Sequence, residues 1–184
     1  MNPELDRDGF VVVSDVVAPE LLPGFANAYD RAMRMASPPE LSVGRTTTRV
    51  SGLDRDPVFA GLAACRPILE ASERTIGGGF RLSALLGRTV HPLTGMQELH
   101  VDFARDQAGF PMVGFIFMLD EFREENGATR FVPGSHRWSN GAQPVAACGP
   151  AGSIVIYNGS VLHGHGANTT GRPRRSIQGA YVRR

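Results

Sequence analysis

The sequence contains little cysteine, no excess charge of either sign and no long hydrophobic run. Its two cysteines, Cys65 and Cys148, stand far apart in 184 residues. This excludes a disulfide framework and a cysteine-rich zinc site, and it favours a reducing compartment. Lys and Arg number 19 against 18 Asp and Glu, for a net charge of +1. That balance gives no electrostatic reason to expect nucleic acid or an anionic membrane as a partner.

Apolar segments long enough for a membrane are also missing. The run Val11–Val13 is too short for a signal-peptide core or a membrane span. The residues before it, MNPELDRDGF, are acidic where a signal peptide would be basic. We therefore expect a cytoplasmic protein that binds no membrane.

What is present is an ordinary globular composition, with 42% hydrophobic and 20% charged residues. No internal repeat, low-complexity tract or linker divides the chain, and its length suits one domain with a sizeable core. The sequence therefore predicts a single domain over residues 1–184. Trp138 and the ten Phe are expected mainly in the core.

Helical signals occupy the first part of the chain. Gly9–Val13 reads as a short strand. Apolar residues at helical spacing then predict one helix after Pro19 and a second over about residues 57–76, with Pro67 as a kink or break. A polar stretch follows the first helix through about Ser51.

From Phe80 onward, short runs rich in β-branched and aromatic residues alternate with Gly, Pro and Asn turns. The expected strands are 80–90, 96–103, 113–119, 129–132, 153–157, 160–162 and 176–182. Helices followed by many short strands predict a small barrel or a double-sheet jelly roll with the helices packed on one sheet. Val113–Leu119 is apolar on both faces, as expected for a strand between the interior and a helix.

A histidine and an aspartate two residues apart are the first candidates for chemistry. On a strand, His100 and Asp102 would point to the same face and could reach one metal ion. Two imidazoles and one carboxylate bind Fe(II) and leave other coordination positions open. Short matches of this kind also arise by chance, so an exposed edge-strand pair is the alternative.

A second segment, residues 163–175, could complete such a site. His163 ends an apolar strand, a Gly/Asn/Thr turn reverses the chain, and a new strand opens with Arg174 and Arg175. In an antiparallel pair the arginine would lie beside the histidine, where a guanidinium could bind the far carboxylate of 2-oxoglutarate. The two arginines should face opposite sides of their strand, and His163 and His165 should share a face. Spacing alone therefore leaves either histidine as the ligand.

Three motifs carry a family resemblance. Residues 97–102, QELHVD, fit the pattern Gln-x-x-His-x-Asp, and residues 126–136, NGATRFVPGSH, fit Asn-Gly-x-x-Arg-x-x-Pro-Gly-Ser-His. Residues 163–168, HGHGAN, precede Arg174, which stands eleven residues after His163. Together with the strand DGFVVV, these motifs make nearly the whole chain resemble the phytanoyl-CoA dioxygenase family, a branch of the Fe(II)- and 2-oxoglutarate-dependent oxygenases.

The resemblance implies a fold, a set of ligands and a reaction. The fold is a double-stranded β-helix, a cupin-like jelly roll with the N-terminal helices packed on one sheet. The implied catalytic residues and metal ligands are His100, Asp102 and His163. Arg174 is implied as the partner of the distal carboxylate of 2-oxoglutarate, with Thr129 and Gln97 hydrogen-bonding that co-substrate. His165 would then line the pocket.

The reaction implied is the hydroxylation of a small-molecule metabolite by dioxygen, with release of succinate and CO2 and with ascorbate as an optional reductant. The alternative is a cupin-like metal-dependent isomerase or dioxygenase that does not use 2-oxoglutarate and needs no Arg174. Dealkylation of nucleic acid is disfavoured by the neutral charge and by the lack of an aromatic-basic stripe. The substrate, the oligomeric state and the roles of His165 and Arg88 are left open, since Arg88 could bind a substrate carboxylate or form a surface ion pair.

Overall fold

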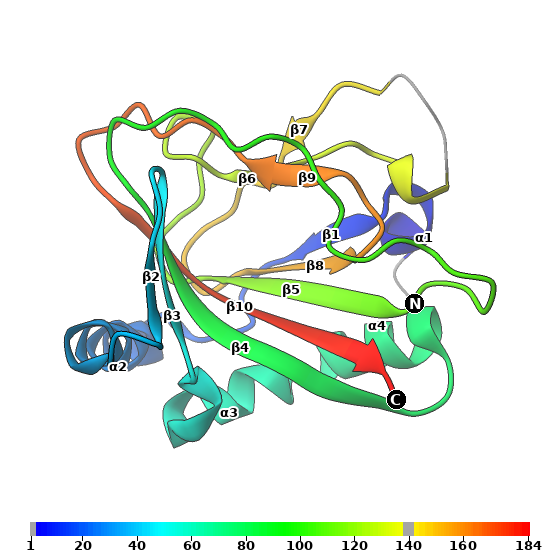
Figure 1. The fold of residues 1–184 in the computed structure, drawn as a ribbon, viewed down its shortest axis with the longest axis horizontal. Helices are drawn as coiled ribbons and strands as arrows, with labels where there is room; N and C mark the ends of the chain where they lie inside the picture. Colours follow the sequence, from blue (N-terminus) through cyan, green and yellow to red (C-terminus); the bar gives the residue numbers. More distant parts are fainter. Residues whose placement is uncertain (1–2, 138–141) are drawn as a thin grey trace.

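Two antiparallel sheets face each other in the computed structural model, which describes residues 3–137 and 142–184 (Figure 1). In spatial order the larger sheet contains β1 (Phe10–Val13), β8 (Ile154–Asn158), β5 (Met112–Met118), β10 (Arg174–Arg183), β4 (Phe80–Val90), β3 (Thr47–Ser51) and β2 (Leu41–Val43). The smaller sheet contains β7 (Val145–Ala146), β6 (Thr129–Phe131) and β9 (His163–His165). The expected double-sheet architecture is therefore present.

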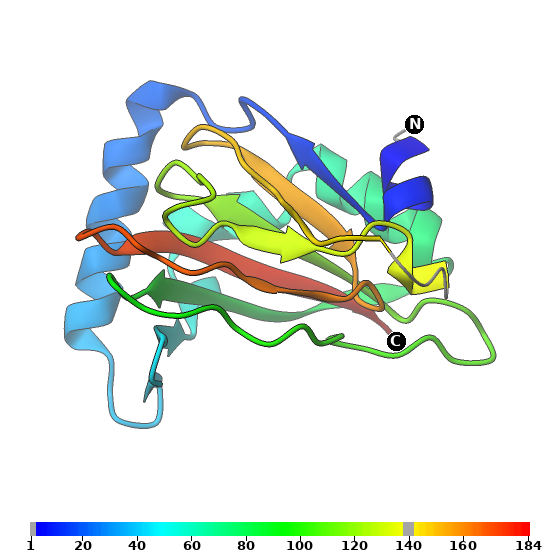
Figure 2. The ribbon, with the colours of Figure 1, turned by 90° about the horizontal axis from the view of Figure 1, so that it is seen from above.

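Helices cover one side of the larger sheet. The α-helices are α1 (Pro3–Asp8), α2 (Leu22–Met35), α3 (Pro57–Ala63) and α4 (Arg66–Ile76), and the 3-10 turns are η1 (Pro19–Leu21), η2 (Leu53–Arg55) and η3 (Ser135–Arg137). In Figure 1, α3 and α4 lie below this sheet while β6, β7 and β9 lie above it. Figure 2 shows the same layers from above, with α2 across the ends of the strands. The expected packing of helices on one sheet is confirmed.

The single helix expected over residues 57–76 is two helices with a break before Arg66. Cys65 caps α4 in an extended conformation, and Pro67 lies in the first turn. Proline has no N–H and is tolerated there because the first N–H groups of a helix have no intrahelical acceptor. Pro67 therefore lies in the first turn of α4. The break that the sequence suggested at this proline lies just before the helix.

Strand β5 separates two apolar clusters, and all of its residues are buried. Phe115 and Phe117 face the cluster between the sheet and the helices. Ile116 and Met118 face the cluster between the two sheets. Alternating residues of one strand therefore build both halves of the core, as its two apolar faces predicted.

Two strands lie where the sequence predicted none, and two expected strands are absent. The polar stretch before Ser51 contains β2 and β3, which pair with each other and continue onto β4. Residues 96–103 form no regular strand but cross the open side of the molecule through isolated bridges such as His100 with His163. Residues 160–162 form a turn, in which the Asn158 side chain accepts from the Ser160 N–H. Local side-chain hydrogen bonds of this kind compete with strand pairing.

Trp138, expected in the core, lies outside the described residues. Cys65 and Cys148 are both free thiols. Within residues 3–137 and 142–184, no helix has the length and apolar character needed to cross a membrane.

Candidate active site

His100, Asp102 and His163 come together on the inner side of the smaller sheet. Each offers a ligand atom, and these atoms all lie within 4.8 Å of one another. The Nε2 atom of His100 is 3.7 Å from Asp102 Oδ1, and the Nε2 atom of His163 is 3.6 Å from Asp102 Oδ2. Two atoms that bind one metal ion at about 2.1 Å each are at most about 4.2 Å apart. Both distances therefore fit a single ion.

Backbone hydrogen bonds hold the two histidines in register. The N–H of each residue donates to the carbonyl oxygen of the other, and both distances are 2.9 Å. Asp102 is positioned separately, because its N–H donates to the carbonyl of Gly159 at 3.0 Å. The irregular segment around residue 100 is thus attached to β9 and to the turn before it, which brings together residues about sixty positions apart.

The tautomer of each histidine follows from the hydrogen bond that its Nδ1 atom makes. The Nδ1 atoms of His100 and His163 lie 3.0 Å from the carbonyl oxygens of Glu98 and Val161. A carbonyl only accepts, so each Nδ1 carries the proton and each Nε2 presents a lone pair toward Asp102. Burial lowers the pKa of His163, which favours the neutral form that a metal ligand requires.

Tyr157 on β8 also touches this site, although no sequence motif pointed to it. Its hydroxyl donates to Asp102 Oδ2 at 2.7 Å, and its ring centroid is 4.8 Å from that of His163. Burial, followed by the charge of Asp102, raises the pKa of Tyr157 well above its usual value, so the hydroxyl is a donor at neutral pH. The only sequence signal was a tyrosine near the end of an apolar strand, six residues before His163.

Glycine makes room for this tyrosine. Gly114 pairs with Tyr157 across β5 and β8. A Cβ atom at position 114 would lie 2.2 Å from Tyr157 Cζ and 2.5 Å from its hydroxyl oxygen. The ring therefore lies across the backbone of β5, and this position brings its hydroxyl to Asp102.

Arg174 is a buried cation that lines the interior between the two sheets. It is 1% exposed, its Nη2 donates to the Gly127 carbonyl at 2.7 Å, and its guanidinium carbon lies 3.9 Å over the Phe122 ring. Its Nε and Nη1 atoms are buried without any hydrogen-bond partner. Burial, and then the nearby Arg88, lowers its pKa to about 9, so it is still charged at pH 7. A buried charge with unused donors is costly unless an anion binds it.

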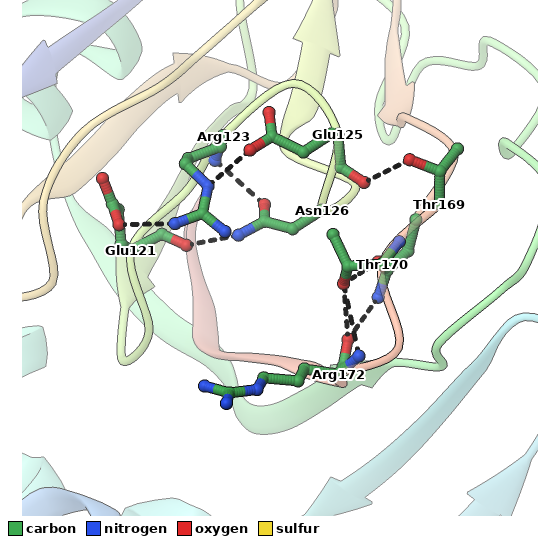
Figure 3. Close-up of polar contacts among 8 residues, drawn as sticks. Glu121, Arg123, Glu125, Asn126, Thr169, Thr170 and Arg172 are labelled. Carbon is green, nitrogen blue, oxygen red and sulfur yellow. Dashed lines mark hydrogen bonds and ion pairs between the residues drawn. The ribbon is translucent and has the colours of Figure 1, made fainter.

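The loop that precedes Gly127 is joined to the turn before β10 by hydrogen bonds among the residues of Figure 3. Asn126 donates to the Glu121 carbonyl at 2.8 Å and accepts from the Arg123 N–H at 2.9 Å. Thr169 donates to the Glu125 carbonyl, which joins this loop to the turn before β10. Gly127 follows with a φ of 81°, a conformation that glycine adopts without strain. The Asn-Gly pair therefore fixes the direction of the Gly127 carbonyl.

Arg174 and His163 do not lie on paired strands, contrary to the sequence analysis. β10 pairs with β4 and β5, whereas β9 pairs with β6. The turn between His163 and Arg174 carries the chain from one sheet to the other. The arginine and the histidine instead meet across the interior, where both line the same cavity of about 220 Å³.

The remaining predicted site residues line this cavity in different ways. Thr129 is 4% exposed and pairs with His165 between β6 and β9. Gln97 accepts from Arg88 Nη2 at 2.9 Å, so its oxygen is already engaged. His165 lies outside the metal-ligand cluster, and its Nε2 is 3.0 Å from Thr46 Oγ1. Burial lowers the pKa of His165 to about 4.

Three further polar residues are engaged in contacts of their own. Arg175 pairs with Asp120 and Asp30 on the side of β10 opposite Arg174. His136 is buried in η3, with its Nε2 3.2 Å from the Asp6 carbonyl. The third, His91, is hydrogen-bonded to Thr48.

Comparisons with known proteins match most of the chain to one protein family. The family model described as phytanoyl-CoA dioxygenase (PhyH) matches residues 5–176. The dioxygenase olcK of Penicillium canescens is 30% identical over 94% of this chain and 66% of its own length. The dioxygenase trt7 of Aspergillus terreus is 28% identical over 94% of this chain and 69% of its own. The chain thus spans about two thirds of these relatives.

A solved structure shows the same fold at low identity. It is the epimerase SnoN in complex with Fe3+, alpha ketoglutarate and nogalamycin RO, 20% identical, with a TM-score of 0.81 over 98% of this chain and 81% of that chain. The double-stranded β-helix expected from the sequence is therefore confirmed.

Proposed function

The chain belongs to the phytanoyl-CoA dioxygenase family and is an Fe(II)- and 2-oxoglutarate-dependent oxygenase, and from that premise we propose which of its residues carry the reaction. His100, Asp102 and His163 hold the iron, and Arg174 binds the distal carboxylate of 2-oxoglutarate. The observation that carries this proposal is a shared cavity. It has a two-histidine, one-carboxylate cluster on one wall and a buried guanidinium with unused donors on another.

The donor set fits ferrous iron. Imidazole and carboxylate ligands suit this ion, and a facial group of three leaves positions for a chelating oxo acid and for dioxygen. When bound, iron with 2-oxoglutarate and dioxygen supplies the oxidation, in which the oxo acid becomes succinate and CO2 and the substrate takes up oxygen. The alternative cupin-like enzyme without 2-oxoglutarate leaves the unpartnered nitrogens of Arg174 unexplained.

The residues around the cluster position its ligands, shield them from water or bind the co-substrate. Tyr157 orients Asp102 through one carboxylate oxygen. Phe131, stacked 5.5 Å from the His163 ring, shields that imidazole from water. Arg174 fixes the co-substrate in the interior between the two sheets. Thr129 lines the co-substrate part of the cavity as a further contact, and Gln97 acts indirectly by holding Arg88.

The substrate is a small-molecule metabolite that is hydroxylated, with dioxygen as the oxidant. Residues 1–184 act as one oxygenase domain without a nucleic-acid or membrane partner. Two free thiols support a cytoplasmic location.

Two measurements test the proposal. Succinate release is followed over a metabolite panel with Fe(II), ascorbate and 2-oxoglutarate. Anaerobic titration of the Fe(II) protein with 2-oxoglutarate then measures co-substrate binding directly. No binding of 2-oxoglutarate by the iron-loaded protein would contradict the proposal and favour the cupin-like alternative.

Replacement of Arg174 separates its role from that of the metal ligands. Arg174→Gln should weaken 2-oxoglutarate binding about 10–150-fold, the effect of losing a charge-assisted hydrogen bond, while iron affinity stays the same. Arg172→Gln is the matched control, because Arg172 lies in the turn just before β10 and lines no part of the cavity. Equal 2-oxoglutarate affinity in both variants would rule out the anchor role.

A further inference from the structure

A row of small side chains crosses the inner face of the larger sheet beneath the cavity. Ala84 on β4 pairs with Ala180 on β10, and Ala180 pairs with Gly114 on β5. Tyr157 on β8 ends the row, and its ring lies over Gly114. Both alanines project only methyl groups and line the cavity that contains the metal-ligand cluster. The space beside the Tyr157 ring is therefore open and has a flat floor.

The cavity opens to solvent at this row. On β10, Arg174 is 1% exposed, whereas Ala180 is only half-buried. On β4, Val90, which pairs with Arg174, is 0% exposed, whereas Ala84, which pairs with Ala180, is exposed. In Figure 1 the end of β10 and the start of β4 extend past the smaller sheet. A molecule that enters after 2-oxoglutarate has bound at Arg174 therefore meets the two alanines.

Charged side chains are confined to the other end of the same strands. The charged residues of the larger sheet that line the cavity are Arg49, Arg88 and Arg174. Arg49 pairs with Arg88, and Arg88 pairs with Ser176, so all three lie where β10 begins. The described lining residues of this sheet that lie closer to the end of β10 are uncharged. Burial of an ionised group without a partner is costly, so this part of the cavity favours a neutral molecule.

One side chain in the uncharged part can recognise a polar group. Gln178 precedes Ala180 by two residues, shares its face of β10 and lines the cavity. Its amide forms no hydrogen bond with another side chain or with the backbone in the part of the chain that the structure describes. An amide offers two donors and an acceptor and carries no charge. It therefore suits a hydroxyl or carbonyl group.

The volume of the cavity limits how much of a substrate it encloses. Its 220 Å³ must hold 2-oxoglutarate as well, whereas pockets that enclose a whole ligand measure about 300–1,000 Å³. Part of the substrate therefore stays at the opening. Phe103 lies at this end and is 51% exposed, because its N–H donates to the Gly159 carbonyl and the Gly159 N–H donates to that of Met112. An exposed aromatic ring at this end suits an apolar substrate.

We propose that Ala84, Ala180 and Gln178 form the substrate subsite, and that the substrate class is neutral molecules with a flat apolar body and a hydroxyl or carbonyl group. The body lies on the two alanines beside the Tyr157 ring, and its oxygen is hydrogen-bonded to Gln178. This inference rests on the proposed function, because it assigns the metal-ligand cluster to iron and Arg174 to 2-oxoglutarate.

The first test needs no substrate and uses three naphthalenes of similar shape. 2-Acetylnaphthalene is neutral and has a carbonyl group, 2-isopropenylnaphthalene is its hydrocarbon counterpart, and 2-naphthoate is charged. The protein is loaded anaerobically with Mn(II) and 2-oxoglutarate, and the paramagnetic relaxation of the probe protons measures binding near the metal, with the Zn(II) protein as baseline. The ketone should bind about 2–10-fold more tightly than the hydrocarbon, the effect of one neutral hydrogen bond. Naphthoate should not bind detectably.

Variants then separate the floor from the polar contact. Ala84→Leu and Ala180→Leu should each weaken binding of both neutral probes about tenfold or more, because the added side chain fills the space of the ring. Ala60→Leu, at an exposed position of α3 outside the cavity lining, is the matched control. Gln178→Met should abolish the preference for the ketone and leave hydrocarbon binding unchanged. If Ala180→Leu does not fold, the exposed position of Ala84 keeps the test available.

The second test uses turnover. Succinate release is screened over matched sets, each a ketone or alcohol, its hydrocarbon and its carboxylate. The neutral oxygen-bearing member should be the substrate, and Ala84→Leu should raise its KM about tenfold or more with the 2-oxoglutarate Kd unchanged.

Several results would overturn the proposal. They are naphthoate binding as tight as that of the ketone, no binding of either neutral probe to the loaded native protein, equal effects of the Ala84 and Ala60 variants, or a ketone preference that survives Gln178→Met. Failure of the proposed function looks different, because the native protein would then bind no 2-oxoglutarate at all.

Discussion

At the scale of single residues, the site depends on which atoms remain free after local hydrogen bonds are made. His163 and His165 share a strand and a face, yet their ring nitrogens have different partners. His163 keeps its Nε2 for the cluster, whereas His165 places its Nε2 against Thr46 and its Nδ1 against the Gly166 carbonyl at 2.7 Å. The second histidine is therefore engaged on both sides.

Alanine at the two positions should give opposite results. His163→Ala should abolish Co(II) binding, measured by the metal's visible absorption, because one of three ligands is lost. His165→Ala should retain Co(II) binding, since its ring already has two protein partners. If the His165 variant loses the metal and the His163 variant keeps it, the ligand assignment is wrong.

Tyr157 should matter through Asp102 and not through substrate. Tyr157→Phe keeps the ring but removes the donor, so metal affinity should fall about 10–100-fold, as is usual for groups that orient metal ligands. Tyr181→Phe is the matched control, because its hydroxyl donates to the Ala63 carbonyl at 2.9 Å, away from the cluster. Mn(II) titration measures both variants, and an equal Kd in both would show that the Tyr157 hydroxyl does not position the ligand.

At the scale of elements, strands β5 and β8 act together. β8 supplies Tyr157, and β5 supplies the glycine over which the ring lies. In an apolar strand such as Met112–Met118, a glycine packs nothing and lowers strand propensity. Its presence is explained by the close approach of the tyrosine ring.

Gly114→Ala should therefore destabilise the protein by about 1–3 kcal/mol and also weaken metal binding, because the ring must move away from Asp102. The stability loss should be smaller when Tyr157 is already leucine. Gly24→Ala in α2, where an added Cβ meets no atom within 4 Å, is the control and should not destabilise. Chemical unfolding of the four-member cycle measures the coupling, and additive effects would contradict the contact.

At the scale of the whole molecule, buried histidines make folding depend on pH. Burial lowers the pKa of His136 and His165 to about 4 each and lowers that of His163 as well. An unfolded histidine has a pKa of about 6.5. Between these values the unfolded chain binds more protons than the folded one, so acid favours unfolding.

The free energy of unfolding of the metal-free protein should be highest above pH 6.5 and fall as the pH approaches 4. For His136 the loss is at most about 3 kcal/mol. Urea unfolding from pH 8 to pH 4.5 measures it, and His136→Gln should make the curve flatter relative to its own value at pH 8. A native protein equally stable at both ends of this range would contradict the burial of neutral histidines.

The sequence alone determined the fold class and the candidate ligands. Short apolar runs separated by turns form strands, and a sheet of such strands buries its apolar face by packing against a second layer. The His-x-Asp pair, the later histidine and the arginine stood out because few other residue types bind iron or a carboxylate. Their spacing left His163 and His165 as alternatives for the second histidine, and the family resemblance implied His163.

The tertiary structure alone decided how these residues meet. His100 lies outside any regular strand and is held by a bridge to His163, and β9 and β10 belong to different sheets. The contacts of Tyr157 with Asp102 and with Gly114 became visible only in the tertiary structure. Local propensity cannot fix such pairings, because strand neighbours are chosen by long-range packing between residues that are distant in sequence.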